Sequence, residues 1–213
     1  MTPTSRLARH LEHYEAVQAY MDEPLFEALS SLIHKVYISS EDYQIRTVVL
    51  AATEIECGVS YLCSCMATLV AMELGPTVLV DGQLLERIAR IGVVPRRSHC
   101  KQINNGPLWV FSSMEARQMV YNEKGHAIPL GVVIEALERE FKYIVIDAPA
   151  LSVASIADML SPYIDGCILV AIPNRTELQD LSEARKRLTA GGGQILGAIC
   201  NSRYSVADTG EIQ

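Results

Sequence analysis

Short apolar runs recur along the chain, and each is continuous instead of alternating with polar residues. The runs are rich in Val, Ile and Leu, which is typical of strands buried on both faces. They are Val48–Ala52, Thr77–Val80, Leu108–Phe111, Tyr143–Ile146, Cys167–Ile172 and Ile195–Cys200. The pattern predicts that these segments form the strands of one parallel sheet.

Stretches with helical periodicity separate several of these runs. Ser60–Leu74 is apolar on nearly all sides, whereas Leu130–Glu140 and Thr176–Leu188 each carry one apolar stripe. Strands that alternate with helices form a parallel sheet that is covered on both faces. We therefore expect an α/β fold with a mostly parallel sheet flanked by helices.

The first 45 residues follow a different pattern. Apolar residues recur at three- and four-residue spacing, which predicts an amphipathic helix, at Leu7, Leu11, Tyr14 and Met21. Asp22 is a candidate N-cap of a second helix, and Pro24 suits its first turn. Either both helices pack on the sheet, or the first helix offers its apolar stripe to another subunit. We therefore expect a helical extension over residues 1–45, packed on or beside the core, and an α/β domain over residues 46–213.

Composition narrows the functional classes. Of the 213 residues, 49% are hydrophobic and 20% are charged, as in globular proteins. The net charge of −7 argues against a general binder of nucleic acids or anionic membranes. No apolar run reaches the ~18 residues of a membrane helix, and the first residues are too polar for a secretory signal. We therefore expect a cytoplasmic protein.

The six cysteines are spread over the chain and do not form a recognisable framework. Cys57, Cys63 and Cys65 lie close together in sequence. However, Cys63 and Cys65 lack the two-residue separation of a zinc site, and no histidine lies nearby. We expect buried free thiols and no metal.

Candidate site residues gather where the predicted strands end. The loop Thr53–Gly58 follows the first long strand and leads into the helix from Ser60, while Asp81 and Asp147 end two later strands. Ligands of open parallel sheets bind at the carboxyl ends of the strands. A loop, a helix and strand-end carboxylates in this order are the layout of a phosphate-binding NTPase, in which the carboxylates organise Mg²⁺ and water.

From about Pro24 to Arg203, the series of motifs resembles the cytoplasmic domain of the bacterial tyrosine kinases of capsular and exopolysaccharide synthesis. These kinases are relatives of the MinD/ParA P-loop ATPases, and the resemblance implies a P-loop NTPase-like, Rossmann-type fold. The segments that match the family motifs, in chain order, are Glu27 in the first helix, Ala52–Tyr61, Asp81–Leu85, Asp147–Ala150, Asp158 and Leu196–Asn201.

The phosphate loop departs from the family pattern at the positions that bind phosphate. A phosphate loop needs glycines, so that its N–H groups approach the phosphates, and a lysine that neutralises them. Val59 stands at the lysine position and Glu56 at a glycine position, and Glu54 adds a second negative charge. The degenerate loop positions are Thr53, Glu54, Glu56, Gly58, Val59, Ser60 and Tyr61, of which Gly58 and Ser60 follow the motif.

The other motifs are also incomplete. Gln83 stands for the second aspartate of the second motif and Leu85 for its arginine; Ser30 and Ile33 stand for the two arginines after Glu27. We therefore expect no metal, although Ser60, Asp81 and Asp147 would hold one if it were bound. Asp81 and Asp147 have an alternative role as caps of strand ends.

Three further features admit a structural or a functional interpretation. Glu27 has lost its arginine partners, which favours a solvated helix face. The basic segments Arg96–Lys101 and Arg185–Arg187 are either solvated faces or docking patches. Only Tyr204 lies near the end of the sequence, so an autophosphorylated tyrosine tail is not expected.

The resemblance implies a component of exopolysaccharide or capsular polysaccharide biosynthesis and export, and these departures predict that it is non-catalytic, needs no cofactor and acts by protein–protein interaction. The resemblance implies two partners: other copies of the chain, in a dimer or higher oligomer, and an inner-membrane chain-length-determining protein of the Wzz type. Such a partner would hold the chain at the inner face of the membrane. The alternatives are an active kinase or ATPase that uses ATP and Mg²⁺ through an aberrant loop, a positioning protein of the MinD type, and a small-molecule binder.

Overall fold

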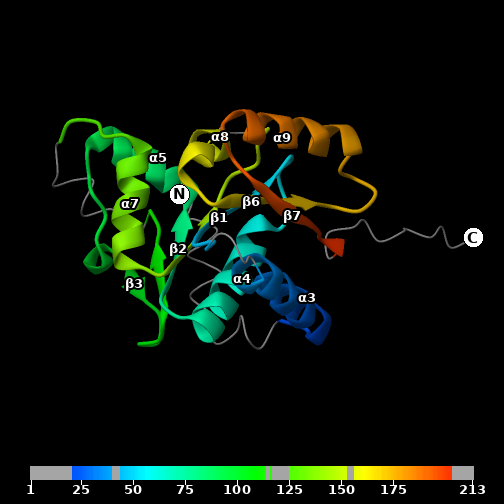
Figure 1. Ribbon diagram of the computed structural model, residues 1–213, viewed down its shortest axis with the longest axis horizontal. Helices are drawn as coiled ribbons and strands as arrows, with labels where there is room; N and C mark the ends of the chain where they lie inside the picture. The colour runs from blue at the N-terminus through cyan, green and yellow to red at the C-terminus, as the bar shows by residue number, and fades with distance from the viewer. Residues whose placement is uncertain (1–20, 40–43, 114–115, 117–124, 153–155, 203–213) are drawn as a thin grey trace, which may run out of the picture.

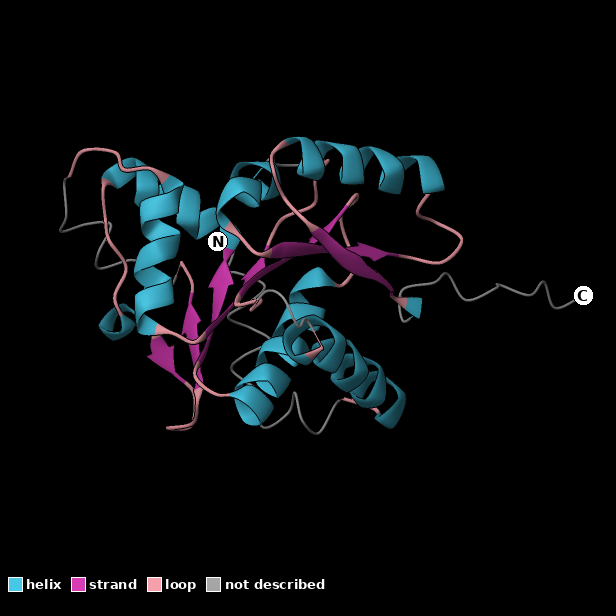
Figure 2. Ribbon diagram, in the orientation of Figure 1, coloured by secondary structure: helices cyan, strands magenta, loops and turns pink. Residues whose placement is uncertain are grey.

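The computed structural model describes residues 21–39, 44–113, 116, 125–152 and 156–202. Its centre is a seven-stranded sheet with the order β3-β4-β2-β5-β1-β6-β7 (Figure 2). All neighbouring strands are parallel except β3 and β4. The strands are β1 (Thr47–Ala52), β2 (Thr77–Asp81), β3 (Lys101–Gln102), β4 (Leu108–Phe111), β5 (Tyr143–Asp147), β6 (Gly166–Ala171) and β7 (Ile195–Cys200).

Helices cover both faces of this sheet (Figure 1). One face carries α3 (Glu23–Ile33), the π-helical turn His34–Ile38 and α4 (Val59–Leu74). The other face carries α5 (Gly82–Ile91), α7 (Leu130–Glu140), α8 (Ile156–Leu160) and α9 (Leu178–Ala190). Short 3₁₀ turns form at Arg97–His99 and Ser161–Tyr163. The mostly parallel, helix-flanked α/β fold predicted from the sequence is confirmed.

Strands β1, β2, β4, β5 and β6 are continuously apolar because each supplies side chains to two separate buried clusters. In β1, Val48, Leu50 and Ala52 belong to the cluster under α3 and α4. Val49 and Ala51 belong to the cluster under α5, α7, α8 and α9. All six residues of β1 are buried, so this strand has no solvent-exposed face on which polar residues would alternate with apolar ones.

Helix α4 is the most deeply enclosed of the described helices. Every residue from Leu62 to Ala71 is buried, because the sheet covers one side of the helix and α3 covers another. Its two internal hydroxyl groups are satisfied locally, since Ser64 and Thr68 donate to the carbonyl oxygens of Ser60 and Ser64 at 2.8 Å. Burial on nearly all sides is the reason that Ser60–Leu74 has no polar stripe.

The second helix of the N-terminal region begins as predicted. Asp22 caps α3 by accepting a hydrogen bond from the amide of Leu25 at 3.1 Å, and Pro24 lies in the first turn. Leu29 and Ile33 of α3 are buried in the same cluster as α4. The amphipathic segment predicted around Leu7 to Tyr14 lies outside the described residues.

Two helices and one strand were not predicted. Helix α5 has a readable signal, because Asp81 is its N-cap and Leu84, Leu85 and Ile88 recur at helical spacing. Helix α8 is only five residues long. Strand β3 begins inside the basic segment Arg96–Lys101, where polarity and a length of two residues hide it. None of the described helices combines the length and apolarity needed to cross a membrane.

Candidate functional site

The predicted site residues converge at the carboxyl ends of the central strands. Asp81 and Asp147 lie side by side, because β2 and β5 are paired in that register. The loop after β1 lies beside the segment after β5: the amide of Leu151 donates to the carbonyl oxygen of Ala52 at 2.8 Å, and the amide of Ser152 donates to that of Thr53 at 3.2 Å. The topology therefore brings the loop and both carboxylates to one edge of the sheet.

The backbone of the loop Thr53–Gly58 retains left-handed turns. Glu56 has a φ of 64° and Gly58 a φ of 77°. The first of these is unusual, since residues with a Cβ rarely adopt this conformation. Glu56 thus keeps a backbone shape that suits the glycine of the family motif, but places an exposed carboxylate there.

The residue at the lysine position is part of the hydrophobic core. Val59 is the first residue of α4, is only 9% exposed and belongs to the cluster under α3 and α4. Ser60 and Tyr61 follow it and are half-buried. On the other side of the loop, the hydroxyl group of Thr53 is buried and has no hydrogen-bond partner among the described residues.

The charge expected at Glu54 is not free, which corrects the sequence-based view of this residue. Its carboxylate accepts a hydrogen bond from Nε of Arg175 at 2.9 Å and another from Oγ1 of Thr176 at 2.9 Å. Both partners lie in the connection between β6 and α9, 121 and 122 residues further along the chain. We call Glu54, Arg175 and Thr176 the loop clamp.

The loop is also held through its backbone. Arg175 donates to the carbonyl oxygen of Ile55 at 2.9 Å. Asn201, which follows β7 and is 6% exposed, donates to the carbonyl oxygen of Cys57 at 2.9 Å. Asn201 could have been singled out from the sequence, because it ends the matched segment Leu196–Asn201. Arg175 carried no such signal, since it lies in a loop outside every motif.

Asp81 acts as a helix cap. It accepts hydrogen bonds from the amide of Gln83 at 3.0 Å and from the hydroxyl of Ser113 at 3.3 Å. Burial raises the pKa of Asp81, and these hydrogen bonds oppose the rise. The backbone is tightly packed beside it: a Cβ on Gly82 would lie 2.9 Å from the carbonyl oxygen of Asp147. The cap role considered from the sequence is therefore observed for Asp81.

The motif positions that lost charged residues serve other purposes. Gln83 is exposed, whereas Leu85, also in α5, is fully buried in the cluster on that face of the sheet. In α3, Ile33 is fully buried and Ser30 donates to Glu73 of α4 at 3.4 Å. Glu27 is exposed, in agreement with a solvated helix face.

The two basic segments contain arginines with structural contacts. The guanidinium of Arg97 lies 4.9 Å from the ring centres of both Trp109 and Phe141. Arg187 pairs with Asp158, which matches the aspartate of the family segment that follows the Asp147–Ala150 motif. Arg96 and Lys101 remain exposed, and so do Arg185 and Lys186.

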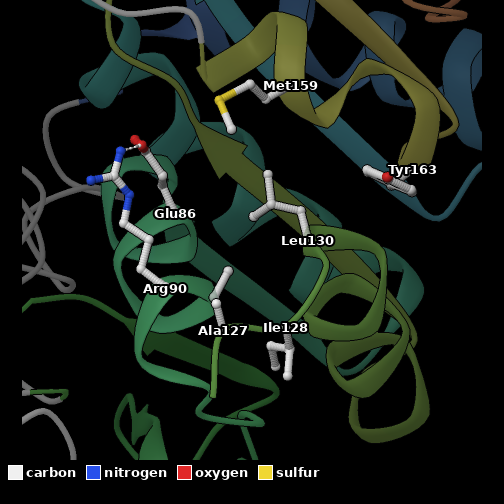
Figure 3. A pocket seen from close by; sticks show the side chains of 8 residues that line it. Glu86, Arg90, Ala127, Ile128, Leu130, Met159 and Tyr163 are labelled. Carbon is white, nitrogen blue, oxygen red and sulfur yellow. Dashed lines mark hydrogen bonds and ion pairs between the residues drawn. The ribbon is translucent and has the colours of Figure 1, made fainter. Parts of the chain in front are cut away.

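A cavity of about 390 Å³ lies between α5, α7 and α8, on the sheet face opposite α4 (Figure 3). Its lining is mostly apolar, and the ion pair between Glu86 and Arg90 lies at its side. The lining residues are Glu86, Ala89, Arg90, Ala127, Ile128, Leu130, Met159 and Tyr163. The cavity does not include any predicted site residue, so it is separate from the loop after β1.

The six cysteines are free thiols. Four are buried, Cys100 is half-buried and Cys200 is exposed, which corrects the expectation that all are buried. Burial raises the pKa of the Cys63 thiol, and the neighbouring Asp147 carboxylate adds to this effect. Among the described residues, no three His, Cys, Asp or Glu side chains are gathered as a metal site.

The side chains at the loop do not match those that hold a magnesium triphosphate. Val59 offers neither charge nor a hydrogen-bond donor, and Glu56 presents a carboxylate at the turn. The guanidinium of Arg175 lies at the loop but is already paired with Glu54. The cation nearest the loop is therefore engaged within the protein by Glu54.

No protein-family model matches the sequence. The tyrosine-protein kinase CpsD of Streptococcus agalactiae is 31% identical over 80 residues, which are 37% of this chain and 35% of that protein. The putative tyrosine-protein kinase CapB of Staphylococcus aureus is 28% identical over 69 residues, or 32% of this chain and 30% of that protein. The chain thus spans about a third of the length of the curated relatives it matches.

Solved structures share the fold over most of the chain. The chimerical protein CapA2B2 gives a TM-score of 0.67 at 14% identity and covers 91% of this chain and 89% of its own. The kinase domain of the Escherichia coli tyrosine kinase ETK gives 0.66 at 16% identity, covering 88% and 81%. The MinD cell division protein of Aquifex aeolicus gives 0.54 at 17% identity, covering 73% and 68%. The predicted resemblance to bacterial tyrosine kinases and MinD-like P-loop proteins is confirmed.

Proposed function

We propose that this chain is a non-catalytic component of exopolysaccharide or capsular polysaccharide biosynthesis and export, a pseudokinase that acts by protein–protein interaction. The observation that carries the proposal is Val59. It occupies the position of the phosphate-binding lysine and is 9% exposed within the core. A buried valine cannot neutralise the charge that develops on a transferred phosphoryl group.

Three further features support the proposal. Glu56 places a negative charge at a turn of the loop, where it would repel a triphosphate. Gln83 replaces one of the paired carboxylates that organise Mg²⁺ in the family, and Leu85 replaces an arginine with a core residue. Because the groups of such a site act as a unit, these losses together remove more than any one would alone.

The proposed partners are other copies of the chain and an inner-membrane chain-length-determining protein of the Wzz type. Such a partner would recruit a cytoplasmic chain to the inner face of the membrane. The similarity to proteins named tyrosine kinases CpsD and CapB motivates this choice. No nucleic acid is proposed, given the net charge of −7.

Calorimetry with ATP, ADP and GTP in the presence of Mg²⁺ tests whether the loop binds a nucleotide. We expect no binding at sub-millimolar concentrations. A dissociation constant in the micromolar range would overturn the non-catalytic proposal and favour the alternative, an active kinase or ATPase with an aberrant loop. The left-handed turns at Glu56 and Gly58 are the observation that favours this alternative, because they preserve the shape of a phosphate-binding loop.

Light scattering tests the proposed assembly. We expect the mass of the full chain to be the same with and without ATP and Mg²⁺, because no phosphate is needed to order the loop. A chain that starts at Asp22 retains the cap of α3 and removes the segment containing Leu7, Leu11 and Tyr14. We expect it to lose self-association. An unchanged oligomer after this truncation would exclude the segment as the contact surface.

A further inference from the structure

Besides the amide of Ser152, which donates to the carbonyl oxygen of Thr53, three side chains from outside the loop after β1 donate hydrogen bonds to it. Glu54 is bound through its side chain, and Ile55 and Cys57 through their carbonyl oxygens. In a phosphate-binding loop, the ligand bonds to successive backbone N–H groups and orders the turns. Here side chains of the protein donate to acceptor groups of the loop, a carboxylate and two carbonyl oxygens, and not to its N–H groups.

The donors are held in place before they contact the loop. The amides of Arg175 and Thr176 both donate to the carbonyl oxygen of Ile172, at 3.3 and 3.0 Å. The hydroxyl of Thr176 in turn accepts a hydrogen bond from the amide of Ile172 at 2.9 Å. Ile172 is 1% exposed in the core. The backbone of the turn that presents Arg175 is therefore anchored to the core beside the sheet.

The charges in the clamp are matched. Arg175 and Glu54 form an ion pair at 2.9 Å, with side chains that are 35% and 30% exposed. Among the described residues, Arg175 is the one cationic side chain with a hydrogen bond or ion pair to the loop. A phosphate that approached the loop would have to compete with Glu54 for this guanidinium.

We infer that the loop clamp of Glu54, Arg175 and Thr176 takes the place of a bound phosphate and holds the loop after β1 in one conformation without any ligand. The loop is thereby tied to the connection between β6 and α9, so that its shape does not change with nucleotide concentration. The inference does not rest on the proposed function, because it concerns the ligand-free protein and is tested there.

Cys57 provides a native probe of the clamp. It lies inside the loop and is 1% exposed, so a thiol reagent reaches it only when the loop opens. Cys63 and Cys65 are fully buried in α4 and report opening of the core, while exposed Cys200 reports the intrinsic rate of the reagent. Alkylation followed by peptide mass spectrometry measures all four rates in one sample.

Arg175→Ala and Glu54→Gln are the test variants, and Arg139→Ala, which breaks an exposed pair with Glu135 on α7, is the matched control. We expect Arg175→Ala to raise the alkylation rate of Cys57 by roughly tenfold, the size of a lost charge-assisted hydrogen-bond pair at a partly exposed site. Cys63 and Cys65 should keep their rates. Glu54→Gln removes the charge and keeps one acceptor oxygen in place of two, so one of the two hydrogen bonds can remain, and we expect a smaller rise in the same direction.

Two results would overturn the inference. The first is a Cys57 rate in both test variants that equals the rate in Arg139→Ala. The second is a fall of roughly tenfold in the Cys57 rate of the unaltered protein on adding millimolar ATP and Mg²⁺, since the clamp would then leave ordering to the nucleotide. If Arg175→Ala does not fold, Glu54→Gln decides, with the Cys57 rate corrected for its thiolate fraction, because burial and the Glu54 carboxylate both raise the pKa of the Cys57 thiol. Failure of the proposed function through nucleotide binding is measured separately by calorimetry.

Discussion

Both ends of β1 are held by hydrogen bonds with side chains elsewhere in the fold, but only its carboxyl end lies where parallel sheets usually bind a ligand. At the amino end, Asp165 accepts hydrogen bonds from the amides of Arg46 and Thr47 at 2.6 and 2.8 Å. Arg46 also donates to the carbonyl oxygens of Glu138 and Phe141 at the end of α7. At the carboxyl end, the loop clamp and Asn201 hold the following loop in the same manner.

At the amino end of a parallel strand no ligand site is expected, and polar groups there are normally hydrogen-bonded within the protein. The carboxyl end is where open parallel sheets bind ligands, and binding requires groups that stay free until the ligand arrives. In this chain, other parts of the protein donate or accept hydrogen bonds at both ends of β1. The comparison indicates that the loop after β1 has a structural role, because it links β1 to the segments that follow β6 and β7.

The largest effect is expected at the amino end. Arg46→Ala leaves carbonyl oxygens at the end of α7 without a cationic donor, and we expect a loss of about 2–4 kcal/mol in the free energy of unfolding. Denaturant unfolding measures this, with Arg139→Ala as the exposed control. A loss below about 0.5 kcal/mol, the usual size for a surface residue, would show that water replaces these contacts.

A smaller effect is expected from Asn201→Ala at the carboxyl end. This change removes the donor that holds the carbonyl oxygen of Cys57, which we expect to cost about 1–2 kcal/mol. Hydrogen exchange should increase in residues 54–58 more than in β1. Equal increases throughout the sheet would mean that Asn201 supports the core and not the loop.

Restoring the family's lysine is expected to destabilise the chain slightly without creating activity. Val59→Lys removes a buried apolar side chain and places a cation at the amino end of α4, which together cost about 1–2 kcal/mol. Glu56, Gln83 and Leu85 stay in place, so we expect ATP hydrolysis at background level. Clear turnover by this single variant would show that the rest of the site is functional.

The smallest effect concerns the pH dependence of Asp81. Burial raises the pKa of Asp81 above its ordinary value of 3.8, so protonation of this carboxyl is easier in the folded chain than in the unfolded chain. This contribution is complete below pH 3.8 and is lost as the pH rises through the raised value in the folded state. Asp81→Asn keeps the cap but cannot ionise. We expect its melting temperature at pH 7 to be higher than that of the unaltered chain.

Melting curves recorded from about pH 3 to pH 7 test this expectation. The advantage of Asp81→Asn should disappear as the pH falls below the ordinary aspartate range. A lower melting temperature at pH 7 would instead mean that the ionised carboxylate stabilises the fold. Adding Mg²⁺ to both proteins provides a control, because a shift confined to the unaltered chain would reveal metal binding at Asp81.

The sheet could be predicted because burial on both faces leaves a direct record in the sequence. Continuous apolar runs such as Tyr143–Ile146, separated by helical stretches, are typical of strands in a covered parallel sheet. Helix α5 has a helical pattern in Leu84, Leu85 and Ile88, but it begins inside the segment Asp81–Leu85. That segment was interpreted as a carboxylate motif, so no helix was predicted there. Strand β3 is too short to leave a pattern.

The site could be predicted only in part. The positions of Asp81, Asp147 and the loop follow from strand order, which a family resemblance makes readable. The pairing of Glu54 with Arg175 joins residues 121 positions apart, and neither lies in a repeating pattern. The sequence shows the charge of Glu54 but does not identify its counter-ion, because partners in separate loops are brought together by the fold alone.

The burial of α4 on all sides has a practical meaning for anyone who divides this gene for expression. Every residue of α4 from Leu62 to Ala71 is buried, and Leu29 and Ile33 of α3 pack in the same apolar cluster. A clone that began at residue 46, just before β1, would lack α3 and expose this apolar surface, so we expect it to be recovered in inclusion bodies. Vectors should therefore keep everything from Asp22 onward, with any fusion partner attached before that residue.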